Sequence, residues 1–172
     1  MKRQGGEEIN APQSTRLQGY KCKAKVKVKE KVKVTTPTGS SGLQNYGAHQ
    51  KALQLFDHVV ADLALLAGRT ECQRLVAQHY ASADSIASNI EEGYGRGSRR
   101  DYAHFLVIAR GSAQETAGRY LRFRHWLPVE LTEQRAALCG EIIAILTASI
   151  LRLREQEKTS SISPPISLDT GQ

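Results

Sequence analysis

Apolar residues recur every three or four positions in four separate segments of the chain, which is the period of an amphipathic α-helix. In the first segment, from about residue 47 to 67, this pattern predicts one helix with a single buried stripe. Gly68 follows it as a natural C-terminal stop. The predicted stripe consists of Leu53, Phe56, Val60, Leu63 and Ala67, with Leu66 beside them.

The second segment begins at Thr70, which with Gln73 matches a capping box, and ends at Gly93. Its predicted core face is Leu75, Val76, His79, Ala83, Ile86, Ala87 and Ile90. Because His79 lies on this apolar stripe, we interpret it as a packed core histidine and not as a metal ligand.

Ser98 is the predicted N-cap of a third helix, and Asp101 adds negative charge to its first turn. This helix should continue until Pro128, and its core face is Tyr102, Phe105, Ala109, Ala113, Thr116, Tyr120 and Phe123. Thr132 is a candidate cap for the fourth helix. There the periodic residues are Leu138, Cys139, Ile142, Ile143, Leu146, Ser149, Ile150 and Leu153.

Four helices joined by short links pack most simply as an up-down-up-down bundle. We therefore expect an all-α domain at residues 46–157. Residues 1–45 and 158–172 are predicted to be disordered tails, because Gly, Pro, Lys and Ser dominate them.

Charge separates the first tail from the rest of the chain. Residues 1–45 hold ten basic and three acidic side chains, so they carry the whole formal net charge of +7, and residues 46–172 are neutral. The basic balance therefore points to nucleic-acid contact mainly through the tail.

Most of this charge lies in a lysine segment, residues 21–34, in which Lys alternates with Val. The alternation matches a β-strand, but the sequence offers no partner strand, so isolated order is not expected. Two interpretations stay open: a cationic arm that grips phosphate backbones, or a non-essential extension.

The link between the second and third helices is rich in glycine: Gly93, Gly95 and Gly97 surround Tyr94 and Arg96. It follows a helix and lacks the Gly-Lys-Ser/Thr ending, so it does not match a P-loop. The glycines are expected to reverse the chain with positive φ angles. A second hypothesis is that N–H groups at the start of the third helix, with neighbouring arginines, hold a phosphate.

From residue 96 to 124 there are seven arginines against Asp101 and Glu115. On a helical wheel Arg99, Arg110 and Arg124 fall within about 40° of one another. This favours either an anionic partner or a subunit interface in which arginines meet carboxylates of a neighbour. The candidate nucleic-acid-binding residues are Arg96, Arg99, Arg100, Arg110, Arg122 and Arg124, together with Lys21, Lys23, Lys25, Lys27, Lys29, Lys31 and Lys33.

Catalytic and metal chemistry find little support in the sequence. The five histidines lack a spacing that places two ligands on one helix face, and Glu91 and Glu92 point about 100° apart on a helix. The three cysteines form no Cys-x-x-Cys pair, which favours a reduced cytoplasm. No run of eighteen uninterrupted apolar residues is present, so we expect no membrane partner. We expect no enzyme activity, catalytic residue, metal site or cofactor.

The central motif resembles that of a known family. It reads Ser88-Asn89-Ile90-x-Glu92-Gly93-Tyr94-Gly95-Arg96-Gly97-Ser98, followed by Phe105-Leu106-x-Ile108-Ala109-Arg110-Gly111-Ser112 and Glu115. It is similar to four-helix-bundle proteins encoded in intervening sequences of bacterial large-subunit ribosomal RNA genes. The resemblance covers about residues 45–155; Glu91, Val107 and residues 1–44 depart from the family pattern.

The resemblance implies a left-handed up-down bundle that assembles into homopentameric rings and has no established enzyme activity. It also extends to the accessory variability protein of diversity-generating retroelements, which binds nucleic acid and a reverse transcriptase. We therefore carry two functional hypotheses. The first is a non-enzymatic accessory protein that binds RNA or DNA backbones, with a reverse transcriptase as a candidate partner. The second is a structural protein-interaction module whose arginines build the oligomer.

Overall fold

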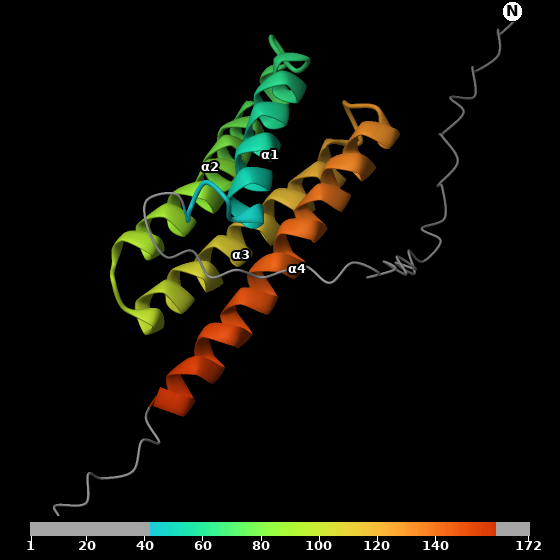
Figure 1. The fold of residues 1–172 in the computed structure, drawn as a ribbon. Helices are drawn as coiled ribbons and strands as arrows, with labels where there is room; N and C mark the ends of the chain where they lie inside the picture. The colour runs from blue at the N-terminus through green and yellow to red at the C-terminus, as the bar shows by residue number, and fades with distance from the viewer. Residues whose placement is uncertain (1–41, 161–172) are drawn as a thin grey trace, which may run out of the picture. The chain divides into compact units, whose positions relative to one another are not determined.

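The computed structural model describes residues 42–160. They form four α-helices: α1 (Gly47–Ala64), α2 (Gln73–Gly95), α3 (Arg99–Phe123) and α4 (Val129–Ser160) (Figure 1). A short 3-10 turn, Thr70–Cys72, precedes α2. This part of the chain contains no β-strand, which confirms the predicted all-α class.

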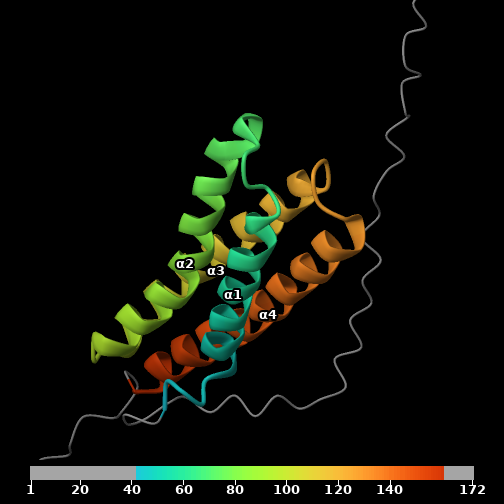
Figure 2. The same cartoon turned by 90° about the horizontal axis from the view of Figure 1, so that it is seen from above.

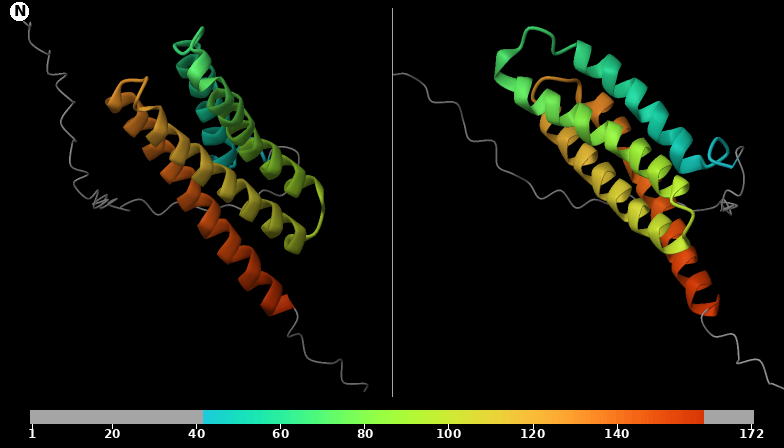
Figure 3. Two further views of the ribbon diagram at one scale, coloured as in Figure 1. Left: turned by 180° about the vertical axis from the view of Figure 1, so that it is seen from behind. Right: turned by 90° about the vertical axis from the view of Figure 1, so that its left-hand side faces the viewer.

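Each helix packs on the helices that precede and follow it in sequence, and α4 returns to pack on α1. The diagonal partners are therefore α1 with α3 and α2 with α4. Figures 2 and 3 show the resulting up-down-up-down bundle. Because the helices alternate in direction, the start of α1, the link between α2 and α3, and the end of α4 lie at one end of the bundle (Figure 1). We call this the link end.

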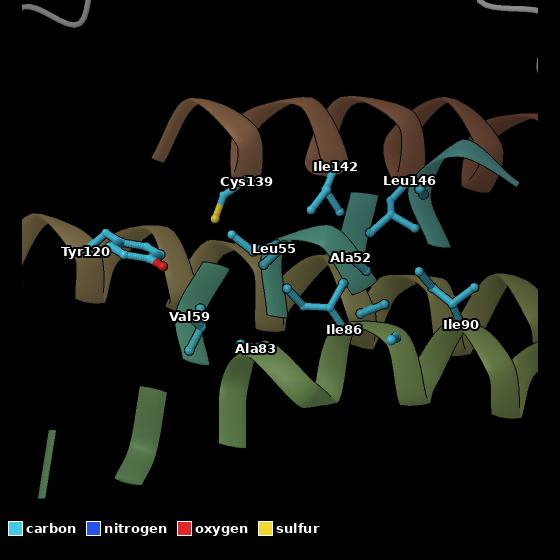
Figure 4. Packing of buried hydrophobic residues seen from close by; sticks show 14 of the residues in the cluster. Ala52, Leu55, Val59, Ala83, Ile86, Ile90, Tyr120, Cys139, Ile142 and Leu146 are labelled. Carbon is cyan, nitrogen blue, oxygen red and sulfur yellow. The ribbon is translucent and has the colours of Figure 1, made fainter. Parts of the chain in front are cut away.

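The core fills the space between the four helices. Figure 4 shows Leu55 of α1 among residues of the other helices, including Ile86 and Ile142. The predicted core faces of α2, α3 and α4 are confirmed, since most of their residues are buried and the rest are partly buried. The partly buried ones are Leu75, Val76, Tyr102, Phe105, Leu138 and Ile143.

The predicted stripe of α1 is wrong over most of its length. Leu53 and Val60 are 46% and 45% exposed, Phe56 is partly buried, and Ala67 is exposed beyond the end of the helix. Leu63 and Leu66 are buried as predicted. The full buried face of the helix is Ala48, His49, Ala52, Leu55, Val59, Asp62 and Leu63. This face includes small and polar residues, so its hydrophobic signal was weaker than that of the residues left outside.

The predicted helix boundaries also need correction. Helix α1 ends at Ala64, before the predicted position, and Gly68 follows with a φ of 83°. Gly93 does not end α2, because the helix continues to Gly95. Thr70 makes no capping hydrogen bond to α2 and belongs to the 3-10 turn before it. Thr132 lies inside the first turn of α4, where its hydroxyl donates to the carbonyl oxygen of Val129 at 2.8 Å.

Gly93 allows α2 and α3 to approach each other closely near the link end. A Cβ atom placed on Gly93 would lie 2.6 Å from the Cβ of Phe105 and 3.0 Å from a ring carbon of Tyr102. Both neighbours belong to the first turns of α3. The glycine is therefore required by backbone proximity and not by a positive φ.

A buried carboxylate connects three helices near the end of the bundle opposite the link end. Asp62 of α1 is 3% exposed and accepts hydrogen bonds from the hydroxyl of Tyr120 on α3 and the Nε of Arg135 on α4, both at 2.9 Å. A second Arg135 nitrogen reaches the other carboxylate oxygen at 3.3 Å. The Tyr120 bond crosses the diagonal between α1 and α3. A buried charge is tolerated when it is paired and hydrogen-bonded in this way.

His79 is a core residue of α2, as predicted, and is fully buried. Its ring meets those of Tyr120 and Phe123 edge to face, with centroids 4.5 and 5.1 Å apart. Neither ring nitrogen has a hydrogen-bond partner within residues 42–160. Burial, with a smaller effect of the Arg119 charge, lowers the pKa of His79 to about 4, although Asp62 acts in the opposite direction.

Helix α4 is the single helix of the described part that is long and apolar enough to cross a membrane, judged by length and composition. Core packing accounts for part of this apolar character, because one side of α4 faces α1 and α3. The buried residues on that side are Cys139, Ile142, Leu146, Ile150 and Leu153.

We predict that Gly93→Ala destabilises the protein by about 1–3 kcal/mol, because the added methyl group overpacks the contact with α3. Gly95→Ala is the matched control: no atom lies within 4 Å of the Cβ it would add, so its stability should be unchanged or slightly higher. Urea unfolding of both variants tests this. Equal stability of the two would show that α2 and α3 separate at little cost.

We also predict that stability falls as pH decreases from about 6.5 to 4. An unfolded histidine has a pKa of about 6.5, so in this window the unfolded chain binds a proton that buried His79 rejects. The free energy of unfolding should drop by roughly 3 kcal/mol from this residue and level off below pH 4. Urea unfolding across this range, with His79→Phe for comparison, measures it. A pH slope that is the same in both proteins would assign the effect to other groups.

Candidate nucleic-acid interface

The link between α2 and α3 is tightly organised by its own side chains. Of its glycines, only Gly97 has a positive φ, 74°, so it alone reverses the chain as expected. Ser98 is the N-cap of α3, as predicted: its hydroxyl oxygen accepts from the backbone N–H of Asp101 at 3.0 Å and donates to the Asp101 carboxylate at 2.8 Å. The side chains of Ser98 and Asp101 thus already bond at the N-terminus of α3, where a phosphate would have to bind. This gives little support to a phosphate held there by backbone N–H groups.

Arg96 packs against the bundle. Its guanidinium forms an ion pair with Glu92 one turn earlier and lies 5.2 Å from the centre of the Phe105 ring. These contacts stabilise the link, because a planar guanidinium combines well with an aromatic face. Arg99 and Arg100 are exposed in the first turn of α3.

The remaining candidate arginines lie far from this end. Arg110, halfway along α3, is partly buried and donates to the hydroxyl of Thr147 on α4 at 3.4 Å. Arg122 and Arg124 are exposed near the end of α3. Since α3 has 25 residues, its two ends are about 36 Å apart. The structure thus places the arginines in two end groups, with Arg110 between them and partly covered.

The end of α4 adds further positive charge to the link end. The start of α1 lies at this end, and so does the end of α4 (Figure 1). Lys21 to Lys33 fall outside the described residues. The last turns of α4 contribute Arg152, Arg154 and Lys158, which the sequence interpretation overlooked. In the sequence these cations alternate with Glu155 and Glu157, so the segment has little net charge and did not stand out.

Acidic side chains accompany these cations. Glu91, which departs from the family pattern, accepts a 2.7 Å hydrogen bond from the Nε2 of His49 of α1. Further from this end, Lys51 of α1 pairs with Glu141 in the first half of α4 at 2.7 Å. The link end therefore has mixed charge within the described residues. A strongly positive surface would require the lysine segment as well.

Hydroxyl and amide groups line the contact between α2 and α3 and are used for packing. Ser85 lies 2.9 Å from Ser112, and Thr116 donates to Ser82 at 3.0 Å. Asn89 donates to the backbone oxygen of Ser85 at 2.7 Å. The motif therefore organises a helix–helix contact.

The described residues contain no group of three His, Cys, Asp or Glu side chains that could hold a metal ion.

Together these features define an all-α scaffold: a four-helix bundle whose central motif holds α2 against α3 and whose cations gather at the helix ends. The model of the 23S rRNA-intervening sequence protein family matches residues 44–148, and the chain belongs to this family.

A solved structure supports the same fold. It is the crystal structure of a protein of unknown function from the S23 ribosomal protein family of Bacteroides thetaiotaomicron. The two chains share 25% sequence identity with a TM-score of 0.56, and the match covers 60% of this chain and 94% of that one. No curated protein matches this chain.

Proposed function

We propose that this protein is a non-enzymatic accessory scaffold that binds RNA or DNA through phosphate contacts. The observation that carries the proposal is the distribution of charge: residues 1–45 hold the whole formal net charge of +7 and lead into α1, whose start lies at the link end, and Arg99 and Arg100 are exposed in the first turn of α3 at the same end. Lysine and arginine in this arrangement favour backbone binding with little sequence preference.

We further propose that the bundle is left-handed and forms a homopentameric ring in the cytoplasm. Exposed apolar residues on α1, α3 and α4 support self-association, since a monomer would leave them in water. A ring would also multiply the number of cations that one nucleic-acid molecule meets. The family's link to 23S rRNA intervening sequences makes ribosomal RNA the first nucleic acid to test.

A reverse transcriptase is a proposed protein partner, on the strength of the resemblance to the retroelement accessory protein. The second candidate function is a protein-interaction module without nucleic-acid binding. It is favoured by the contacts of Arg96, Arg110 and Arg119, each of which already has a partner within the bundle.

We predict that the full chain binds a labelled single-stranded oligonucleotide and that its affinity falls steeply with salt. For every phosphate that the protein no longer neutralises, the plot of log affinity against log salt should become flatter by about 0.7. Changing the seven lysines from Lys21 to Lys33 to Gln should therefore reduce the slope by up to about 5 and weaken binding strongly. Fluorescence anisotropy titration at several salt concentrations measures both effects.

A second pair of variants tests the bundle's own contribution. Arg99→Gln with Arg100→Gln should weaken binding about threefold to tenfold and reduce the slope by about one to two. Arg69→Gln with Arg74→Gln is the matched control, because these two arginines are exposed at the opposite end. Absence of binding by the intact protein at low salt would favour the protein-interaction module instead.

A further inference from the structure

Two diagonal helices of the bundle, α1 and α3, carry exposed apolar residues on their outer faces. The outer face of α1 is Gln50, Leu53, Gln54, Asp57, Val60, Ala61 and Ala64, all exposed. The outer face of α3 is Arg100, His104, Val107, Ile108, Gly111, Gln114, Glu115, Gly118, Leu121 and Arg122, all exposed or partly exposed. Because α1 and α3 are diagonal partners, these faces lie on opposite sides of the bundle (Figure 2).

The outer face of α3 has two glycines that the fold of one chain does not require. Gly111 and Gly118 lie inside the helix, where glycine is less stable than alanine. Nothing lies within 4 Å of the Cβ atoms that these residues lack, in contrast to Gly93. Ile108 and Leu121, which flank the glycines, are 39% and 54% exposed. Around the two glycines this surface has little side-chain volume and apolar neighbours, although charged and polar residues share the face, and it suits the close approach of another helix.

The outer face of α1 has the matching shape. Leu53 and Val60 project from it seven residues apart, and Gly111 and Gly118 are also seven residues apart. Both spacings correspond to about 10.5 Å along a helix axis. Two aliphatic side chains of one copy therefore match, in spacing, the two positions without side chains in another.

The charges of the two faces are also complementary. Asp57 lies between Leu53 and Val60 and is the only ionisable residue on the outer face of α1. The outer face of α3 has Arg100 and Arg122 against Glu115. One face is thus slightly negative and the other slightly positive, which would favour this pairing over contact between two identical faces.

We infer that the outer face of α1 docks on the outer face of α3 of a second copy of this chain. The contact is head to tail, because each copy offers α1 to one neighbour and α3 to the other. The inference rests on the oligomer proposed above and assigns the surfaces that build it. It also explains why Leu53 and Val60 of α1 lie outside the core.

Two interface variants and one control test this contact in the full chain. The α1 variant is Leu53→Glu with Val60→Glu, and the α3 variant is Gly111→Glu with Gly118→Glu. Leu151→Glu with Gly140→Glu is the control, because it places the same charges at exposed positions of α4. Circular dichroism should show the same helicity in all three. Light scattering coupled to size exclusion then gives their masses.

The control should keep the oligomeric mass of the wild type, whereas each interface variant should be a monomer. An equimolar mixture of the two interface variants should form a one-to-one dimer, because one intact contact exists between them. Retention of the oligomer by either variant would overturn the inference. So would two monomers that do not pair on mixing, or a monomeric wild type. Oligonucleotide binding is measured separately on the wild type, so loss of that binding with an intact oligomer would contradict only the nucleic-acid function.

Discussion

The arrangement of the bundle depends on the buried carboxylate of Asp62. Three of the four helices meet at this group, since α1 supplies the carboxylate, α3 supplies the Tyr120 hydroxyl and α4 supplies the Arg135 guanidinium. A charge in the interior is costly unless every partner is in place, so this cluster fixes the depth and rotation of α1 relative to its diagonal partner. Apolar packing alone would tolerate other rotations of a helix with two apolar stripes. Burial together with the neighbouring carboxylate also raises the pKa of Tyr120, so its hydroxyl remains a donor.

The rotation of α1 about its axis could not be predicted from the sequence. In α2, α3 and α4 the most periodic apolar stripe was also the one that packs, so the core could be predicted from spacing. In α1 the packing face includes His49 and Asp62, whose partners Glu91, Tyr120 and Arg135 come from distant parts of the chain. Such long-range polar pairs leave no local signal. The glycine-rich link was easy to locate, but the reason for Gly93 became clear only from its distance to Phe105.

The candidate site could be predicted in part. The lysine segment and the excess of arginine in residues 96–124 are visible in composition alone. A helical wheel placed Arg99, Arg110 and Arg124 on one line, yet it could not show that Arg110 lies against Thr147 of another helix. Nor could it show that Arg96 is held by Glu92 and Phe105. Counting charges in the sequence therefore overstates the positive surface available to a nucleic acid, because some of the arginines already contact other residues of the bundle.

An even number of alternating helices has a consequence for how such a protein can change. The start of α1 and the end of α4 both lie at the link end, so sequence appended to either of them would leave the bundle from the same side (Figure 3). The opposite end, with its short connections, stays clear of such additions. A relative could therefore gain, lose or exchange a charged extension without rebuilding the helical core. The bundle would then stay the same among relatives, and the appended segments would determine which partner each relative binds.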